Sequence, residues 1–418
     1  MYQKSMNMKR KTLFEQVSFP KLTLKNRFVR SGVWMEMADE QGHLTPDLID
    51  VYKALVDGGV GFIITEYTYI DVNDQPNPRM IGMYDDSFIS EWKEIIDYAH
   101  AKGTKIACQI ASGGSQSGLA ASKHRRIVGP SAVLNRVTGI TPEEMTKDDI
   151  LHIIESHKKA ALRVKKAGFD AVQIHAAHGY LLSQFLTPYY NRRKDEYGGS
   201  LENRMRFMDM VMEEVMKAAG SDMAVLVKMN MRDGFRGGME LDETMQVARR
   251  LEQSGAHALV LSGGFVSKAP MYVMRGEMPI RSMTHYMTCW WLKYGVRMVG
   301  KWMIPSVPFK EAYFLEDALK FRAALKIPLV YVGGLVSRDK IDEVLDDGFE
   351  AVQMARALLN EPGFVNRMRA EENARCNCRH SNYCIARMYS IEMACHQHLK
   401  EELPPCLKKE IEKIEAKG

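Results

Sequence analysis

Short apolar segments alternate with longer amphipathic segments along most of this 418-residue chain, and this alternation constrains the fold more than any other feature. Eight short segments have the length and composition of buried strands: residues 28–33, 61–66, 105–111, 170–175, 223–229, 257–262, 328–333 and 350–355. Helical patterns lie between them, at residues 46–57, 90–101, 146–167, 201–218, 240–254, 313–325 and 338–347. Many of these helical segments end in glycine just before the next strand, which suits a left-handed helix C-cap.

Eight strand–helix units over about 340 residues predict an α/β fold of the closed (β/α)8 TIM-barrel type, which usually needs ~250 residues plus insertions. The alternative is an open, doubly wound sheet. The first strand is not followed by a GxGxxG turn, and its absence weakens that alternative. We therefore predict a barrel over residues 1–370 and a Cys/His-containing extension over residues 371–418.

The charge pattern limits the kinds of partner. The net charge is +5, and Lys and Arg are interleaved with Asp and Glu, so nothing indicates a nucleic-acid footprint. No apolar run is long enough to cross a bilayer, and the basic start of the chain has no apolar core after it, as a secretory signal would. We expect a cytoplasmic enzyme that acts on a small molecule, alone or as a homo-oligomer, with no membrane partner.

Two long excursions follow predicted strands, at residues 112–141 and 263–310. Both would lie at the carboxyl face, where barrels keep their active sites. The second is rich in large apolar side chains: Met271, Tyr272, Met274, Met278, Tyr286, Trp290, Trp291, Trp302 and Met303. They would form an apolar lid over a deep pocket, or they would only pack the insertion onto the barrel.

Polar side chains gather where several predicted strands end. His175 ends the fourth strand, and His178 and Tyr180 fall in the turn just past it. Alternation along the third and fifth strands points Gln109 and Lys228 into the barrel, where a lysine is costly unless it is paired or binds a ligand. This grouping indicates a ligand site. The alternative for the strand-end residues is structural: the histidine bonds a loop and the tyrosine caps the core.

The seventh and eighth strands lead into Gly333-Gly334 and Ala355-Arg356. Glycine amides after the seventh strand and an arginine after the eighth are typical of phosphate binding in barrels. The alternative for Arg356 alone is a surface ion pair. A phosphate at this end, with Gln109 and Lys228 at the other, predicts an elongated, planar, anionic ligand.

Four motifs, at residues 26–32, 106–109, 175–188 and 191–204, resemble those of the Old Yellow Enzyme family of FMN-dependent NAD(P)H oxidoreductases. The resemblance covers about residues 12–370 and implies FMN at the carboxyl face of the barrel. It implies eight cofactor-binding residues: Ser31, Gly32, Gln109, Lys228, Gly333, Gly334, Ala355 and Arg356. Gln109 would bond the flavin pyrimidine, Lys228 would stabilise the anionic reduced flavin, and the last four would hold the phosphate.

The resemblance also implies a reaction. Hydride would pass from NADH or NADPH through FMN to an electron-poor alkene such as an α,β-unsaturated carbonyl compound. His175 and His178 would bind the carbonyl oxygen, and Tyr180 would donate the proton. A flavin-free barrel lyase or isomerase acting on a phosphorylated substrate is the alternative function, and a non-catalytic binding protein is a third.

The extension holds five of the seven cysteines. Its Cys378, Cys384 and Cys395 resemble the iron–sulfur ligands of the larger 2,4-dienoyl-CoA reductase branch, but Ser381 stands at one ligand position. Three thiolates make a poor [4Fe–4S] site, so we expect a vestigial cluster-like segment that binds no metal. A zinc site that uses His380, His396 or Cys376 is the alternative.

Overall fold

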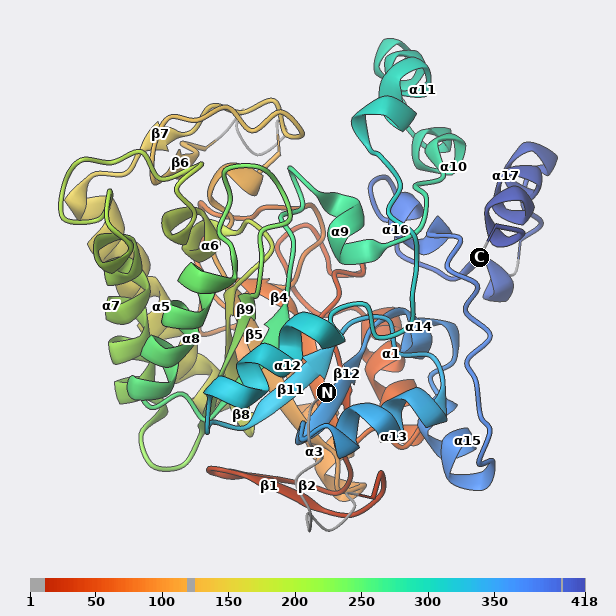
Figure 1. Cartoon of the computed structure of the whole chain (residues 1–418), viewed down its shortest axis with the longest axis horizontal. Helices are drawn as coiled ribbons and strands as arrows, with labels where there is room; N and C mark the ends of the chain where they lie inside the picture. Colours follow the sequence, from red (N-terminus) through yellow and green to blue (C-terminus); the bar gives the residue numbers. More distant parts are fainter. Residues whose placement is uncertain (1–11, 119–124, 400, 418) are drawn as a thin grey trace.

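The structure is a computed structural model that describes residues 12–118, 125–399 and 401–417. Eight parallel strands form a closed barrel surrounded by helices (Figure 1). The strands are β3 (Phe28–Arg30), β4 (Phe62–Tyr69), β5 (Lys105–Ala111), β8 (Ala171–Ala176), β9 (Ala224–Asn230), β10 (Ala258–Ser262), β11 (Leu329–Val332) and β12 (Ala351–Met354). Each lies at a predicted position. The basic start of the chain, at residues 1–11, lies outside the described residues.

Strand pairing decides between the two predicted topologies. The first barrel strand, β3, pairs in parallel with β4 on one side and with the last strand, β12, on the other. This pairing closes the sheet, so the open doubly wound alternative is wrong. Strand β4 continues three residues past its predicted end, after a register shift between Ile64 and Tyr67 against β5.

Helices cover the outside of the barrel. They are α1 (Pro46–Asp57), α2 (Phe88–Glu91), α3 (Lys93–Ala101), α5 (Lys147–Ala167), α6 (Leu181–Leu186), α7 (Leu201–Ala219), α8 (Leu241–Gln253), α12 (Leu315–Ala324), α13 (Arg338–Asp346), α14 (Arg356–Asn360) and α15 (Phe364–Ala370). The predicted helix at 90–101 is divided at Trp92 into α2 and α3. Helix α5 shows why the boundaries could be predicted: Thr146 and Asp149 form a capping box at its start, and Gly168 ends it with φ 96°.

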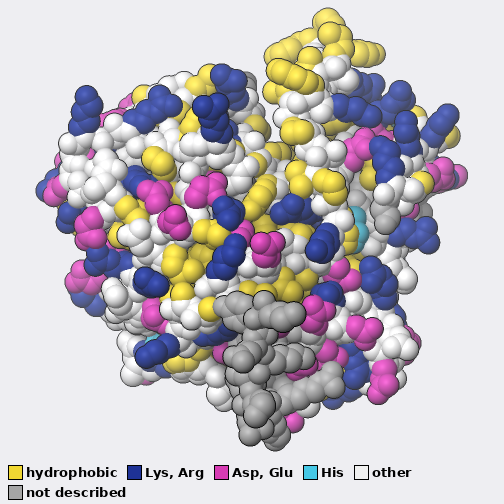
Figure 2. Space-filling model, in the orientation of Figure 1, with side chains coloured by type: hydrophobic (Ala, Val, Ile, Leu, Met, Phe, Trp, Pro, Cys, Tyr) yellow, Lys and Arg dark blue, Asp and Glu magenta, His cyan; other side chains and the backbone are white. Residues whose placement is uncertain are grey.

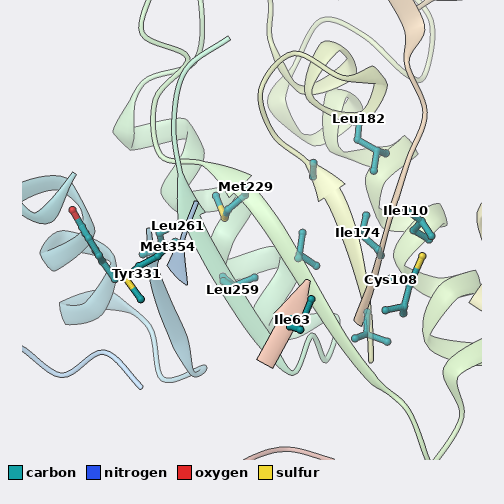
Figure 3. Packing of buried hydrophobic residues seen from close by; sticks show 14 of the residues in the cluster. Ile63, Cys108, Ile110, Ile174, Leu182, Met229, Leu259, Leu261, Tyr331 and Met354 are labelled. Atoms are coloured by element: carbon teal, nitrogen blue, oxygen red, sulfur yellow. The ribbon is translucent and has the colours of Figure 1, made fainter. Parts of the chain in front are cut away.

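Alternation along the strands produces two cores. Outward-facing side chains pack against the helices, as Figure 3 shows for Ile63, Cys108, Ile110, Ile174, Met229 and Leu259. Inward-facing side chains, mostly small or β-branched, fill the lumen. The hairpin of β1 (Val17–Phe19) and β2 (Leu22–Leu24) packs against this inner core and lies below the barrel in Figure 1. The other end of the barrel is left for polar groups.

The segments outside the strand–helix repeat lie mostly at one end of the barrel (Figure 1). The first insertion contains β6 (Val128–Gly129) and β7 (Glu143–Glu144). The second contains α9 (Pro270–Met274), α10 (Ile280–His285) and α11 (Trp290–Met303). The extension adds α16 (Tyr383–Arg387) and α17 (Pro405–Glu415), which pack against α10. Across the described ranges, every helix is too short or too polar to cross a membrane.

Candidate active site

One cavity of about 490 Å³ lies at the carboxyl ends of the barrel strands. Ten of the eleven predicted site residues line it: Ser31, Gly32, Gln109, His175, His178, Tyr180, Lys228, Gly333, Ala355 and Arg356. The exception is Gly334, which adopts φ 70°. It packs against Tyr313, because a Cβ at this position would lie 2.7 Å from that ring. The structure therefore brings the predicted residues together from six different strands.

Strand register explains why the lysine and the first histidine meet. His175 on β8 and Lys228 on β9 are paired positions in the parallel ladder, and both face inward. One step deeper, the amide nitrogen of Gln109 donates to the side-chain oxygen of Gln173. Among the described residues, the amide nitrogen of Gln173 and Nδ1 of His175 have no hydrogen-bond partner although both are buried. His175 lines the cavity, and an unpaired buried polar atom there is suited to bind a ligand.

The turn after β8 is held by polar contacts. His178 adopts φ 60°, an uncommon backbone conformation for a residue with a side chain. Its backbone N–H donates to the side chain of Asn230, and its Nε2 lies 2.7 Å from Oγ of Ser262. Its ring stands nearly perpendicular to that of His175, with 5.3 Å between the centroids. The two imidazoles are thus fixed side by side at the cavity wall.

The charge state of these groups follows from their burial. Burial lowers the pKa of His175 and of His178 well below the ordinary 6.5, and the nearby charge of Lys228 lowers both further. Both imidazoles are therefore neutral at physiological pH, and each keeps one N–H to donate. Lys228 itself is 4% exposed. Burial, and then repulsion from Arg30, lowers its pKa to about 8, so it remains mainly cationic at pH 7.

Tyr180 lies against a second tyrosine, Tyr67, which is not among the predicted site residues. Its ring centroid is 4.9 Å from that of Tyr67 and 4.8 Å from that of His175. The amide of Asn77 donates to the Tyr67 hydroxyl at 2.7 Å. Burial raises the pKa of Tyr180 above its ordinary 10, although hydrogen bonding to Tyr67 opposes this increase. Tyr180 is consequently a protonated phenol over the whole physiological range.

The cavity wall below these residues leaves no room for a side chain at Gly32. A Cβ there would lie 2.6 Å from the carbonyl oxygen of Thr65 and 3.1 Å from Oε1 of Gln109. Ser31 is fixed beside it because its N–H donates to the carbonyl of Met354 at 2.9 Å. A flat ligand could approach the backbone closely only where the side chain is missing.

The predicted phosphate end is more crowded than expected. The Arg356 guanidinium lines the cavity but also donates to the side chain of Asn382 and to the carbonyl of Met274. The surface ion pair considered as the alternative for Arg356 does not occur within the described part of the chain. Its partners are instead neutral oxygens from the extension and from the second insertion.

The second insertion contributes less to the cavity than a lid would. Met274 lines it, and Met271 and Met278 are buried. Trp290, Trp291, Trp302 and Met303 neither line the cavity nor pack on the barrel, because they lie exposed on α11. Both predicted roles are wrong for these residues.

Other lining residues could not have been found from local patterns. Ile385, Met388, Tyr389 and Met393 come from the extension, and only tertiary packing brings them to the cavity wall. Tyr67 had no such signal either: alternation from Ile64 would turn it outward, and the register shift between Ile64 and Tyr67 pairs it with Gln109 and so brings it to the cavity.

The cysteines of the extension lie around a second, small cavity. Cys378, Cys384 and Cys395 line it together with Ser381 and His380. All seven cysteines are free thiols, and burial raises the pKa of Cys384 to about 12. Within the described ranges, no three His, Cys, Asp or Glu residues are grouped so that they could hold a metal ion. The vestigial character of this segment stays a prediction.

Comparisons with known proteins agree with this architecture. The sequence profile of the NADH:flavin oxidoreductase / NADH oxidase family matches residues 12–285. The chain is 33% identical over 380 residues to a 4,4'-dithiodibutanoate disulfide reductase of Rhodococcus erythropolis, covering 91% of this chain and 93% of that protein. It is 35% identical over 352 residues to an NADH oxidase of Thermoanaerobacter brockii, covering 84% of this chain but only 49% of the oxidase.

A solved structure, 2-naphthoyl-CoA reductase in complex with 2-naphthoyl-CoA, has a similar fold. Its TM-score is 0.78 at 20% identity, and the match covers 96% of this chain and 58% of that one. This likeness shows the barrel architecture alone. The profile and the relatives show more: the chain belongs to the NADH:flavin oxidoreductase / NADH oxidase family, and it is an oxidoreductase that uses FMN with NADH or NADPH as the reductant.

Proposed function

We propose that this protein reduces an electron-poor alkene, such as an α,β-unsaturated carbonyl compound, at the cavity lined by His175, His178 and Tyr180. The observation that carries the proposal is the convergence of two neutral imidazoles and a protonated phenol beside a buried cation, Lys228. Family membership excludes the alternative function, a flavin-free lyase or isomerase, because the family uses FMN.

The cavity has features that fit FMN. There is no room for a Cβ at Gly32, so the cavity meets bare backbone there. Gln109 lines the cavity, and the amide of Gln173, to which it is hydrogen-bonded, has a buried donor without a partner among the described residues. Lys228 supplies a buried positive charge, which suits the electron-rich pyrimidine edge of a flavin. Gly333 and Arg356 would hold the phosphate. Bound FMN supplies the hydride that the reaction needs.

The chain's own residues would bind and protonate the acceptor. His175 and His178 would each donate an N–H to its carbonyl oxygen and so stabilise the negative charge that grows there as hydride reaches the β carbon. Tyr180 would then give its proton to the α carbon. Because its pKa is raised, the Tyr180 phenol is fully protonated at neutral pH and can donate that proton.

The decisive experiment separates the two half-reactions in Tyr180→Phe. We expect reduction of the flavin by NAD(P)H to stay near the wild-type rate, and alkene reduction to slow by about 10²–10⁴-fold, the usual contribution of a general acid. Tyr190→Phe is the matched control, since Tyr190 is buried but does not line the cavity. If both half-reactions of Tyr180→Phe slowed equally, the assignment of Tyr180 would be wrong.

A disulfide is a second candidate acceptor, supported by the Rhodococcus relative that matches along nearly its whole length. Reducing a disulfide takes a hydride and a proton and releases two thiols, so Tyr180 could protonate the departing sulfur. Stopped-flow reoxidation of the reduced enzyme by cyclohexenone and by 4,4'-dithiodibutanoate distinguishes the two. The faster acceptor identifies the class that the cavity prefers.

A further inference from the structure

Helix α11 exposes an unusual number of large apolar side chains. The described residues include fifteen exposed large hydrophobic side chains, and eight of them lie on this helix: Trp290, Trp291, Leu292, Tyr294, Met298, Val299, Trp302 and Met303. Met298 and Trp302 are 83% and 86% exposed. Figure 2 shows them as a continuous apolar knob that projects above the molecule, at the position of α11 in Figure 1. Such a patch marks an interaction surface.

One side of α11 fastens it to the protein. Gly300 is its only fully buried residue, and a Cβ there would lie 3.1 Å from Ile280 on α10. The basic residues lie close to this attachment: Lys293 donates to the carbonyl of His285, and Arg297 donates to the hydroxyl of Thr284. The helix therefore stands fixed on α10 with its apolar side turned away from the protein.

The charges on this segment have one predominant sign. Helix α11 contains Lys293, Arg297 and Lys301 and no acidic residue. Over residues 277–304 there are four basic side chains against one acidic residue, Glu277, which pairs with Lys301 and with Lys417. Lys293 and Arg297 have no acidic partner among the described residues, so this flank of α11 carries an excess of positive charge.

Three tryptophans on one side and a basic flank are a combination found in helices that lie in a membrane interface. Tryptophan rings prefer the headgroup level, and basic side chains at the flank reach the lipid phosphates. With 14 residues, α11 spans about 21 Å, less than the ~30 Å hydrocarbon core, so it could lie on a bilayer but not cross it.

We propose that α11 docks this protein onto the surface of a bilayer that contains anionic phospholipid. The expectation of no membrane partner rested on the lack of a spanning run, a criterion that a surface-bound helix does not have to meet. The role is independent of which acceptor the enzyme reduces.

A second copy of the chain is the other occupant to weigh. In a twofold symmetric contact the same patch lies on both partners. Two helices that carry only positive charge would then face each other, and their like charges would repel. An anionic headgroup layer has the complementary charge, which favours lipid as the occupant.

Vesicle co-sedimentation of the FMN-loaded protein tests the proposal. We expect binding to vesicles of phosphatidylcholine mixed with phosphatidylglycerol and much weaker binding to phosphatidylcholine alone. Trp291→Ser with Trp302→Ser should weaken binding roughly tenfold or more for each tryptophan. Lys293→Gln with Arg297→Gln should weaken it about fivefold for each charge. The matched control is Leu151→Ser with Leu162→Ser, two exposed apolar residues on α5.

A second measurement uses the unmodified protein. Brominated lipid in the mixed vesicles should quench its tryptophan fluorescence, because the α11 indoles would enter the interface. Equal binding of wild type and the tryptophan variant, or no quenching, would overturn the proposal. Sedimentation velocity tests the other occupant. If the wild type is a dimer, the tryptophan variant is a monomer and neither binds vesicles, the proposal is overturned and a second copy of the chain is the occupant.

Discussion

Replacing Lys228 with methionine should stabilise the FMN-free protein and at the same time weaken FMN binding. The side chain is 4% exposed, and burial, followed by repulsion from Arg30, lowers its pKa from 10.5 to about 8. A lowered lysine pKa means that the charged form prefers the unfolded chain. Below pH 8 the wild-type protein therefore carries a buried charge that costs folding free energy, and methionine has a similar volume without that charge.

The magnitude follows from the two pKa values. Each pKa unit corresponds to 1.36 kcal/mol, so the free energy of unfolding at pH 7 should rise by up to about 3 kcal/mol in Lys228→Met. As the pH rises from 8 to 10.5, wild-type Lys228 loses its proton and the difference should disappear. FMN binding should weaken by about 10–100-fold, the usual effect of losing a charged hydrogen bond.

Urea denaturation of the FMN-free proteins at pH 7 and pH 10 measures the first effect, and flavin fluorescence measures the second. Lys93→Met is the control: its side chain is 75% exposed and pairs with Asp97 on the surface, so we expect a change within about 0.5 kcal/mol. A Lys228→Met protein that is less stable at pH 7, or equally stabilised at both pH values, would refute the reasoning.

Three further predictions concern the rest of the site. Gly32→Ala should purify without FMN because its Cβ would meet backbone, whereas Gly295→Ala, with open space around it, should keep the flavin absorbance. His175→Ala combined with His178→Ala should abolish the long-wavelength band that phenol binding to the wild-type flavoenzyme is expected to produce; a retained band would count against the pair. Iron and sulfide analysis of anaerobically purified protein should find neither in stoichiometric amount, and a full cluster would show that the segment 371–418 is not a remnant.

The predicted residues that line the cavity could be found from the sequence because they lie on regular strands or just after them. Period-two alternation places Gln109 and Lys228 inside the barrel whichever residues surround them, and the parallel ladder then aligns Lys228 with His175. Motif resemblance added the FMN contacts and the catalytic residues of a known family, and ten of those eleven residues line one cavity.

The remaining features depend on contacts between distant segments. The pairing of Arg356 with Asn382 and the contribution of Tyr389 to the cavity wall arise from how the extension packs on the barrel, and no local pattern encodes that packing. The exposure of α11 is another such feature, because the same apolar sequence would suit a lid, a buried helix or a docking surface.

By itself the sequence determined the barrel, the inward-facing polar residues and the family, because strand periodicity and short motifs are local properties of the chain. Only the tertiary structure decided that the barrel closes through β3 and β12, that the imidazoles are neutral beside Lys228, and that the tryptophans face outward. The physical reason is that closure, desolvation and exposure are set by neighbours far away in the sequence, which exist only once the chain has folded.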